Sequence, residues 1–456
     1  MKISVIGLGK LGACTAVCFS AKGYEVIGVD INADLVAAIN QGIAPFYEPR
    51  LQELIDRSKD RFCATEDFTV AIEQSNITFL IVPTPSRPDG HFSDQYLQDA
   101  LRLLSEALRN KKEFHTFVIT STVSPGTINK KLVPLIEKYS KKTLNKEFGI
   151  AYNPEFIALG SVITDFLNPD LVLIGESCLQ VGDQLEAMYK RVCETDPYVA
   201  RMSINSAEIA KISINSYVTT KISFANTLAS LCEEIEDADV DDITAALGAD
   251  KRISPYYLKG GLGFGGPCFP RDNRAFAAFA ADLGIDAKLA KATDGINQFQ
   301  NDRLCQHINQ ICVKKGVNKV AILGLSYKSC TPVIEESAAI KIIKSLLHKN
   351  IELTVYDPLA MESAKKMFAE TINYADSIKS CLAAATVCLV MTADSAWLEI
   401  EETHFVHQLT TLVDCWRLFE RHQFGKVAEI IRLGEYNVAW LEGHGIKNLA
   451  FSEGIV

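Results

Sequence analysis

The chain opens with a short β-branched apolar run from Lys2 to Ile6, which predicts a buried strand. A glycine-rich turn from Gly7 to Gly12 follows, and apolar residues then recur at helical spacing through Phe19. A second run, Glu25 to Val29, predicts a strand that ends at Asp30. Strand, tight turn, helix and strand together predict a βαβ unit at the start of the chain.

Two further buried strands are predicted at Ile77 to Val82 and at Thr116 to Thr120. Each is followed by a turn-forming segment, Pro83-Thr84-Pro85 in the first case and Ser121 to Gly126 in the second. Functional loops of doubly wound sheets lie at such strand ends, so both turns are candidate binding loops. Leu171 to Gly175 is predicted to be the last strand of this first domain.

The middle of the chain has a helical pattern from Ser206 to Glu236 without a glycine or proline. About 30 helical residues span roughly 45 Å, which indicates a helix that links domains. A glycine-rich loop from Gly260 to Gly266 interrupts the helical pattern, which is predicted to resume from Asp272 to Gln300.

The last part of the chain repeats the pattern of the first. Lys319 to Gly324 predicts a strand with a glycine turn, Glu335 to His348 a helix, and Leu353 to Tyr356 a strand that ends at Asp357. We therefore predict an α/β fold with two Rossmann-like doubly wound domains, joined by a long central helix and a small helical domain. The predicted domain boundaries are 1–202, 203–300 and 301–456.

Composition restricts the class of protein. The 456 residues are 48% apolar and 22% charged, which is typical of a soluble multidomain protein, and the net charge of −10 argues against a nucleic-acid partner. Thirteen cysteines without a CxxC motif indicate reduced thiols and neither a disulfide framework nor a zinc site. No segment approaches the roughly 20 apolar residues of a membrane helix. We expect a cytoplasmic protein with no membrane partner and no metal.

Gly7, Gly9 and Gly12 form a GxGxxG fingerprint between a predicted strand and a predicted helix. Such glycines permit a tight turn, close approach of the backbone to a pyrophosphate and close helix packing. Asp30 stands at the position that binds the adenosine ribose, and its carboxylate repels a 2′-phosphate. The pattern predicts bound NAD in preference to NADP; the alternative is that the glycines serve packing alone.

The segment Gly265 to Asp272 displays Cys268 on a loop rich in glycine and proline. Most cysteines are buried and inert, but these glycines forgo packing and indicate close approach to a ligand. A thiol is mostly protonated at neutral pH, so a nucleophilic cysteine needs activation. Asp272, one helical turn away, is a candidate base, and it could equally be an aspartate that binds amide donors in a helix's first turn.

Lys211 and Asn215 lie four residues apart on the long predicted helix and would share a face. Such a pair could hold a developing oxyanion, one as a charge and one as a neutral donor. The alternative is that Lys211 is a solvated helical lysine.

Motifs in one order along the chain resemble those of the UDP-glucose/GDP-mannose dehydrogenase family, from Met1 through at least Arg417. They are Gly7-Leu8-Gly9-Lys10-Leu11-Gly12, Pro83-Thr84-Pro85, Ser121-Thr122-Val123, Asn153-Pro154-Glu155-Phe156, Glu208 to Lys211 with Asn215, Gly263 to Phe269, and Leu323 to Lys328.

The resemblance implies an NAD-dependent, two-step oxidation of a sugar C6 alcohol to a carboxylate while the sugar stays attached to a nucleoside diphosphate. In that scheme Cys268 traps the aldehyde as a thiohemiacetal, carries the acyl group as a thioester, and is released by water. Residues 1–202 would bind NAD, 203–300 would form a helical dimerisation domain, and 301–456 would bind the nucleotide sugar.

The family's functional residues can be carried over position by position. Catalytic roles fall on Cys268, Lys211, Asn215, Asp272, Thr122 and Glu155. Cofactor contacts fall on Gly7, Leu8, Gly9, Lys10, Leu11, Gly12, Asp30, Pro83, Thr84, Pro85, Ser121, Thr122 and Arg271. Substrate contacts fall on Glu155, Phe156, Ile157, Lys211, Asn215, Arg252, Tyr257, Lys259, Gly265, Lys328 and Arg417. Arg252 resembles an arginine that reaches the neighbouring subunit's site, so we expect a homodimer built on the long helix.

Three positions depart from the family pattern. Ala158-Leu159 replaces a common Arg-Glu pair and removes one acidic group, and Glu335 stands where a cofactor-side arginine is usual. Leu35 occupies a position that is often basic near the adenosine ribose. These changes bear on the cofactor's diphosphate contacts and on the hydrolytic water, and they leave the nucleophile unchanged.

The preferred substrate is UDP-glucose, with UDP-N-acetylhexosamines and GDP-mannose as alternatives, because relatives that use these sugars share the same motifs. A one-step hydroxyacid dehydrogenase would share the first domain and a catalytic lysine but has no use for Cys268. A catalytically silent NAD-binding scaffold is the alternative from a different class.

Overall fold

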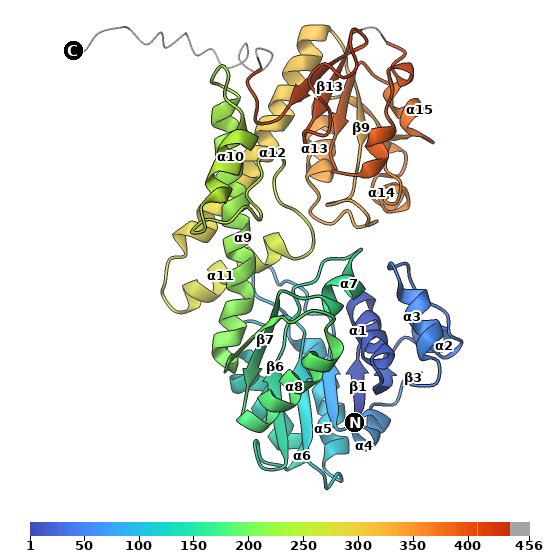
Figure 1. Cartoon of the computed structure of the whole chain (residues 1–456), viewed down its shortest axis with the longest axis vertical. Coiled ribbons are helices and arrows are strands. Elements are labelled where there is room, and N and C mark those ends of the chain that lie inside the picture. Colours follow the sequence, from blue (N-terminus) through green and yellow to red (C-terminus); the bar gives the residue numbers. More distant parts are fainter. Residues whose placement is uncertain (408, 438–456) are drawn as a thin grey trace, which may run out of the picture. The chain divides into compact units, whose positions relative to one another are not determined.

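The computed structural model describes residues 1–407 and 409–437. The chain forms two compact units, Met1–Ile214 with Ala275–Asp286, and Asn215–Arg274 with the chain from Ala287 onward (Figure 1). Each unit has its own sheet. Helix α9, Ile204–Cys232, begins in the first unit and continues in the second, so the long central helix predicted from the sequence is present.

The first unit is built on an eight-stranded sheet with the order β3-β2-β1-β4-β5-β6-β7-β8 in the described part of the chain. Its strands are β1 Lys2–Ile6, β2 Glu25–Val29, β3 Phe62–Thr65, β4 Ile77–Leu80, β5 His115–Ile119, β6 Phe148–Tyr152, β7 Leu171–Glu176 and β8 Tyr198–Ser203. Strands β1 to β6 are parallel, whereas β7 runs antiparallel to β6, with Tyr152 opposite Gly175. The parallel part places the ends of β1, β4, β5 and β6 at one edge.

Helices cover both faces of this sheet (Figure 1). Apolar side chains on one face pack against α1 Lys10–Ala21, α2 Ala33–Asn40, α3 Leu51–Ser58, α7 Val162–Leu167 and α8 Leu179–Val192. The other face packs against α4 Phe68–Gln74, α5 Gln95–Leu108, α6 Val133–Ser140, which continues a π-helical turn at Ile128–Leu132, and the start of α9. Because both faces are covered, the strands are continuous apolar runs, as the sequence showed.

Strand β8 corrects the prediction that Leu171 to Gly175 ends the sheet, because β8 pairs with β7 along its whole length. The sequence pattern does not reveal β8, since this edge strand is largely half-buried and carries a charged residue. Arg201 forms ion pairs with Glu176, Asp183 and Glu186. An edge strand with a polar face has no apolar run to find.

The second unit contains a six-stranded parallel sheet with the order β11-β10-β9-β12-β13-β14 in the described residues. Its strands are β9 Lys319–Leu323, β10 Glu352–Tyr356, β11 Asn373–Tyr374, β12 Val387–Val390, β13 Thr410–Asp414 and β14 Ala428–Arg432. Helices α12 Lys288–Lys315, α13 Ala338–Leu347 and α14 Met361–Phe368 pack on one face. The other face is covered by α15 Ile378–Leu382 and the short 3-10 helices Ser395–Glu399 and Glu402–His404, and a third 3-10 helix, Ala369–Thr371, follows α14.

The repeat predicted between the two halves of the chain is also seen in individual hydrogen bonds of the two glycine turns. Gly7 has a φ of +90° and donates its N–H to Val29 O at 2.8 Å, while Gly324 has a φ of +93° and donates to Tyr356 O at 2.9 Å. A side chain at either glycine would be strained by this backbone conformation. Both sheets therefore share the strand and the glycine turn, whereas the helix follows the turn directly at Lys10 in the first unit and only at Ala338 in the second.

Several helix boundaries differ from the sequence prediction, and α9 ends at Cys232, four residues before the predicted end. The pattern from Asp272 to Gln300 forms two helices, α11 Phe269–Asp282 and α12 Lys288–Lys315, separated by a turn in which Gly284 has a φ of +72°. Helix α13 begins at Ala338, three residues after the predicted start. A helix cannot continue through a left-handed residue, so the glycine ends α11 where the polar and apolar pattern alone continues.

The remaining helix of the second unit is α10, Val240–Ala249, which begins after Asp239. The Asp239 carboxylate accepts a hydrogen bond from the Asp241 amide at 2.7 Å and so caps this helix. Among residues 1–407 and 409–437, no helix is long and apolar enough to cross a membrane.

Candidate active site

The fingerprint residues Gly7, Leu8, Gly9, Lys10, Leu11 and Gly12 form the turn after β1 and the first turn of α1. A Cβ on Gly12 would lie 1.8 Å from the carbonyl oxygen of Gly7, so only glycine lets the helix pack this closely on the turn. A Cβ on Gly9 would meet no atom within 4 Å, so space is open before the helix N-terminus. Amides at a helix N-terminus face outward and favour a phosphate there. This turn fits the pyrophosphate of a dinucleotide.

Asp30 follows β2 and lies beside the fingerprint turn. One carboxylate oxygen accepts from Leu8 N at 2.6 Å and the other from Asn32 N at 2.9 Å. Each carboxylate oxygen has a second lone pair, so ribose hydroxyls can still donate to this group. Asp357, its equivalent in the second unit, is buried and accepts from four backbone amides, those of Leu325, Ser326, Leu359 and Ala360. The carboxylate of the first unit is the one suited to a cofactor ribose.

The loops after β4 and β5 lie at the same edge of the sheet as the fingerprint turn. Ser121 donates its hydroxyl to Val82 O at 2.7 Å, which links the segment Ser121-Thr122 to the segment Pro83-Thr84-Pro85. Because β1 and β4 are neighbours and their connections leave in opposite directions, this edge is a topological switch point, where open α/β sheets bind ligands.

Glu208 anchors the end of the loop after β5, a role that the sequence did not reveal. Its fully buried carboxylate accepts from Gly126 N at 2.6 Å and from Ile128 N at 3.0 Å. Burial raises the pKa of Glu208 to about 7, although the two amides oppose this rise. The start of α9 therefore fixes the loop that carries Thr122.

Glu155, Phe156 and Lys211 lie together in the first unit, beyond the end of β6. The buried Lys211 donates its ammonium to the backbone oxygen of Glu155 at 2.7 Å and lies 4.3 Å from the centre of the Phe156 ring. The Glu155 carboxylate accepts from the Tyr189 hydroxyl at 3.0 Å. Burial raises the pKa of Glu155 to about 7. A carboxyl with a pKa near neutrality is suited to moving protons.

The segment after Phe156 is held by a residue that sequence patterns did not single out. Glu48 is buried, and its carboxylate accepts from Gly160 N at 3.0 Å and from Val162 N at 2.8 Å. Ile157 and Leu159 pack against the apolar core on the α1 face of the sheet. Leu159, which stands in place of an acidic residue, thus contributes an apolar contact.

Cys268 is in the second unit, directly before α11, and is exposed. Its backbone oxygen accepts from Asp272 N at 2.8 Å, which is the first hydrogen bond of the helix. The partial positive charge of a helix N-terminus stabilises a thiolate. Most of the other cysteines are buried or half-buried, and only Cys63 and Cys330 share the exposure of Cys268.

Asp272 and Asn215 are paired in the second unit. Asn215 donates its side-chain amide to Asp272 Oδ2 at 2.7 Å, and both residues are buried. The other oxygen, Oδ1, lies 3.5 Å from Nε of Arg271. Asp272 is therefore held by side chains of α9 and α11, and its role as base or helix-end aspartate stays a prediction.

The glycines before Cys268 pack on the segment that leads into α13. Gly266 has a φ of +83° and donates its N–H to Glu335 O at 3.1 Å. A Cβ on Gly265 would lie 2.4 Å from the backbone oxygen of Glu336. The side chain of Glu335, the substituted cofactor-side position, is exposed. The cysteine loop thus packs on the backbone directly before α13.

The other predicted substrate contacts are spread over the second unit. Tyr257 is exposed, with its ring edge-on to Phe269 at 6.1 Å between centroids. Lys259 is exposed and Lys328 half-buried. Arg252 is highly exposed and pairs with Asp250 at 2.6 Å. The side chains of Tyr257, Lys259 and Arg252 are therefore accessible to solvent and to a ligand.

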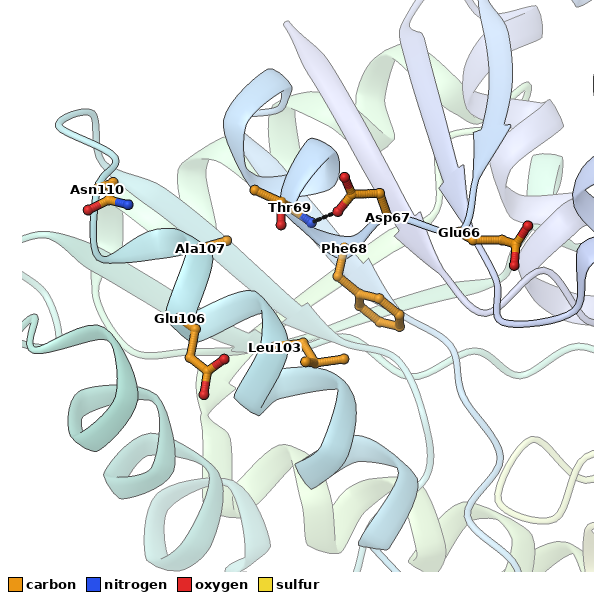
Figure 2. A pocket seen from close by; sticks show the side chains of 8 residues that line it. All are labelled: Glu66, Asp67, Phe68, Thr69, Leu103, Glu106, Ala107 and Asn110. Carbon is orange, nitrogen blue, oxygen red and sulfur yellow. Dashed lines mark hydrogen bonds between the residues drawn. The ribbon is translucent and has the colours of Figure 1, made fainter.

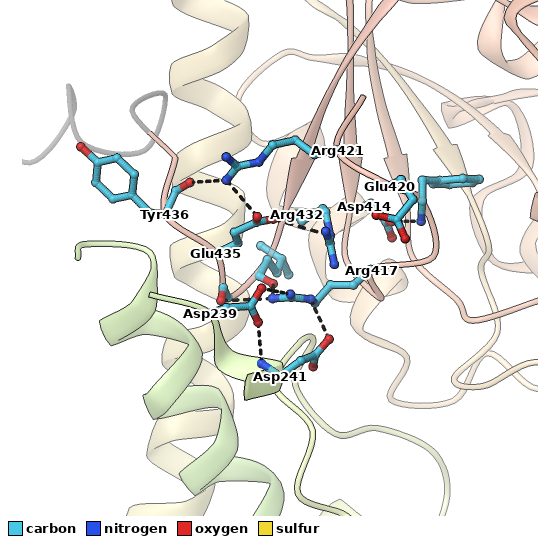
Figure 3. Close-up of polar contacts among 12 residues, drawn as sticks. Asp239, Asp241, Asp414, Arg417, Glu420, Arg421, Arg432, Glu435 and Tyr436 are labelled. Carbon is cyan, nitrogen blue, oxygen red and sulfur yellow. Dashed lines mark hydrogen bonds and ion pairs between the residues drawn. The ribbon is translucent and has the colours of Figure 1, made fainter. Parts of the chain in front are cut away.

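Arg417 is enclosed in a polar network (Figure 3). Its guanidinium pairs with Asp239 at 2.5 Å and with Asp241 at 2.9 Å, and its side chain is only 2% exposed. It also donates to the backbone oxygen of Gly434 at 3.2 Å. In this arrangement Arg417 joins the start of α10 to the chain after β14, and its contact with the substrate stays a prediction.

An open hollow of about 440 Å³ lies between the start of α4 and α5 (Figure 2). Its lining residues are Glu66, Asp67, Phe68, Thr69, Leu103, Glu106, Ala107 and Asn110. Asp67 accepts from Thr69 N at 2.7 Å, which caps α4. None of the predicted site residues lines this hollow, so we assign it no role. Within the described residues, no group of three or more His, Cys, Asp or Glu side chains is placed to hold a metal ion.

Comparison with known proteins gives consistent matches along the chain. Models of the UDP-glucose/GDP-mannose dehydrogenase family match in order: the NAD binding domain over residues 1–193, the central domain over 205–299 and the UDP binding domain over 321–421. The chain is 34% identical to the UDP-glucose 6-dehydrogenase AglM of Haloferax volcanii, over 93% of this chain and 98% of that protein.

Two further similarities extend these matches. The chain is 35% identical to GDP-mannose 6-dehydrogenase of Pseudomonas aeruginosa, over 78% of this chain and 81% of that protein. The solved structure of a UDP-glucose dehydrogenase from Pyrobaculum islandicum superposes with a TM-score of 0.86 at 29% identity, covering 96% of this chain and 98% of that one.

Proposed function

The chain belongs to the UDP-glucose/GDP-mannose dehydrogenase family, and on this premise we propose that it oxidises the C6 alcohol of UDP-glucose to the carboxylate in two steps. The observation that carries the proposal is the exposed Cys268 at the N-terminus of α11, with the Asp272–Asn215 pair behind it. A one-step dehydrogenase needs no such nucleophile.

NAD is the cofactor, as the match to the family's NAD binding domain indicates. The residues fit this group, because Gly9 leaves open space before α1 and Asp30 retains acceptor capacity for ribose hydroxyls. When bound, NAD accepts one hydride in each of the two oxidations. Gly7 to Gly12, the 83–85 segment and Ser121-Thr122 would hold it, and the family resemblance assigns Arg271 as a further contact.

Cys268 would supply the covalent step. Its sulfur would bond to C6 of the sugar aldehyde as the carbon–oxygen π bond breaks, and the thiol proton would pass to the carbonyl oxygen, which gives a thiohemiacetal. After the second oxidation the same sulfur holds the sugar as a thioester. Water then attacks the carbonyl carbon, the carbon–sulfur bond breaks, and the thiolate is restored.

The other polar residues would manage charge and protons. Lys211 and Asn215, one turn apart on α9, would stabilise the oxyanion with a charge and a neutral donor. Asp272, Thr122 and Glu155 would accept and return protons during oxidation and hydrolysis. The near-neutral pKa of Glu155, about 7, supports its part in that role.

The nucleotide sugar would be held by residues from several loops. We assign these contacts to Glu155, Phe156, Ile157, Lys211, Asn215, Arg252, Tyr257, Lys259, Gly265, Lys328 and Arg417. Residues 1–202 would form the NAD-binding domain, 203–300 the dimerisation domain and 301–456 the nucleotide-sugar domain, of which 408 and 438–456 lie outside the described residues.

The relatives support UDP-glucose as the proposed sugar. This chain covers 98% of the length of the UDP-glucose 6-dehydrogenase of Haloferax volcanii and 81% of the length of the GDP-mannose 6-dehydrogenase of Pseudomonas aeruginosa. The third family model is described as a UDP binding domain. UDP-glucose is therefore the proposed substrate, and GDP-mannose is the second candidate.

We also propose a homodimer built on α9. Tyr217, Phe224 and Leu231 are exposed large apolar side chains, spaced seven residues apart on this helix. Residues at this spacing lie on one face of a helix. A second copy of the chain would bury this stripe.

A panel of UDP- and GDP-sugars, scored for NADH release, tests the proposal. UDP-glucose should give the highest kcat/KM, and Cys268→Ala should bind NAD as tightly as the wild type while forming no acid. The exposed Cys330 provides the matched control, because Cys330→Ala should keep wild-type activity. Wild-type protein that binds NAD but oxidises no sugar of the panel would indicate the silent scaffold instead.

A further inference from the structure

The Tyr189 hydroxyl on α8 lies between two acceptors. It is 2.6 Å from Asn153 Oδ1 and 3.0 Å from Glu155 Oε1, and the tyrosine is only 2% exposed. A phenol has one hydrogen to donate, so Tyr189 can serve only one of these acceptors at a time. Its partner must depend on whether Glu155 is ionised.

Asn153 is fixed in an orientation that presents an oxygen to Tyr189. Its side-chain nitrogen donates to Leu173 O at 2.9 Å, and its backbone N–H donates to Ile119 O at 2.9 Å. Exchanging the amide oxygen and nitrogen would place an acceptor against the Leu173 carbonyl, with no hydrogen between the two oxygens. Asn153 therefore acts as a constant acceptor.

We propose that Tyr189 is a positioning residue that holds the Glu155 carboxyl in place in both of its protonation states. When Glu155 is ionised, Tyr189 donates its hydrogen to the carboxylate. When Glu155 is protonated, its own O–H donates to the phenol oxygen, and Tyr189 turns its hydrogen to Asn153. No heavy atom needs to move, and Glu155 keeps a hydrogen bond to Tyr189 in both states. The inference rests on the proposed function, in which Glu155 moves protons.

The groups that face Glu155 come from three other elements. Burial raises the pKa of Glu155 to about 7, and the hydrogen bond from Tyr189 of α8 and the charge of Lys211 of α9 oppose this rise. Cys193, at the end of α8, and Cys18, from α1, are thiols whose own pKa values burial raises, so both stay neutral around Glu155. Tyr189 is thus the neutral donor that acts directly on the carboxylate.

Two substitutions should move the titration of Glu155 in opposite directions. Tyr189→Phe keeps the ring but removes the donor to the carboxylate, so ionisation becomes harder. We expect the alkaline rise of kcat to move up by about one pH unit, a roughly tenfold loss of rate well below the midpoint, because bonds to charged groups are the stronger ones. Asn153→Leu removes the acceptor that serves the protonated state, so the midpoint should move down.

The matched control is Tyr374→Phe, which removes a phenol in the second unit that donates to Ala369 O at 2.8 Å. This variant should keep the wild-type pH profile. A structural defect alone would lower kcat at every pH without shifting the midpoint. Unchanged midpoints in both Tyr189→Phe and Asn153→Leu, or shifts in the same direction, would overturn the proposal.

A second measurement does not depend on turnover. Infrared difference spectra between low and high pH, taken for the wild type and for Glu155→Gln, identify the carboxyl band of Glu155. Its midpoint should rise in Tyr189→Phe and fall in Asn153→Leu. If no nucleotide sugar yields NADH, the proposed function fails, yet this titration still decides whether Tyr189 controls Glu155.

Discussion

Asp272 accepts a 2.7 Å hydrogen bond from the side-chain amide of Asn215, which joins the first turn of α11 to α9 inside the second unit. An amide nitrogen carries two hydrogens, so Asn215 retains a second one for donation to an oxyanion. The carboxylate thereby sets the orientation of the amide. Asp272 and Asn215 would act as one assembly near Cys268, the residue directly before α11.

Asp272→Asn should lower kcat roughly 10²- to 10⁴-fold without abolishing turnover, because a positioned base contributes about that much to the rate. The change removes the negative charge and keeps the shape of the side chain. Steady-state NADH release gives the measurement. Asp282→Asn, at the exposed end of the same helix, should retain wild-type rates. Equal rates for Asp272→Asn and the wild type would rule out Asp272 as a base.

Gly9→Ala should weaken NAD binding while leaving the melting temperature unchanged, because a methyl group there meets no protein atom but occupies the space before α1. Gly12→Ala should lower both the affinity for NAD and the melting temperature, since its Cβ would lie 1.8 Å from the Gly7 oxygen. Calorimetric titration with NAD and thermal melting separate the two effects. Gly295→Ala in α12, also in open space, should leave NAD affinity unchanged and stabilise its helix by up to about 1 kcal/mol.

Glu208 makes stability depend on pH. Its folded pKa, about 7, lies above the ordinary value of 4.5, so the folded state holds a proton that the unfolded chain releases between these values. Raising the pH through this window should therefore favour unfolding, by at most about 3 kcal/mol. Glu208→Gln cannot ionise, so the stability difference between wild type and variant should change from about pH 5 to pH 8. Urea unfolding at both pH values tests this, and a constant difference would contradict it.

Phe224→Glu should convert the proposed dimer to a monomer, because it puts a charge in the centre of the exposed apolar stripe on α9. Sedimentation velocity gives the oligomeric state directly. Leu398→Glu, at an equally exposed apolar position of the second unit, should stay dimeric. A wild-type monomer at micromolar concentration would reject the dimer itself.

Local sequence patterns predict much of the fold. The strand, glycine turn and helix after Lys2 and again after Lys319 were predicted, because parallel strands covered on both faces are continuous apolar runs. The long helix α9 was evident because it contains no glycine or proline. Strand β8 was missed because Arg201 interrupts it with charge, and the break before α12 was missed because Gly284 looked like one more helical position.

The candidate site likewise contains some residues that the sequence predicts and others that only the structure reveals. Cys268, Lys211 and the fingerprint glycines stand in recognisable segments, so sequence alone singled them out. Glu48 and Glu208 were not assigned roles, because their partners are backbone amides 112 and 82 residues away, at Gly160 and Gly126. Tyr189 looks like any buried residue of an amphipathic helix, and only its contact with Glu155 shows what else it does.

The stoichiometry of the reaction tests the central claim most directly. Purified protein is given a limiting amount of UDP-glucose with excess NAD, and the NADH formed is compared with the sugar consumed and the uronate recovered. The account predicts two NADH for each sugar and complete conversion to the acid. One NADH for each sugar, with an aldehyde or ketone as the product, would contradict a covalent four-electron oxidation at Cys268.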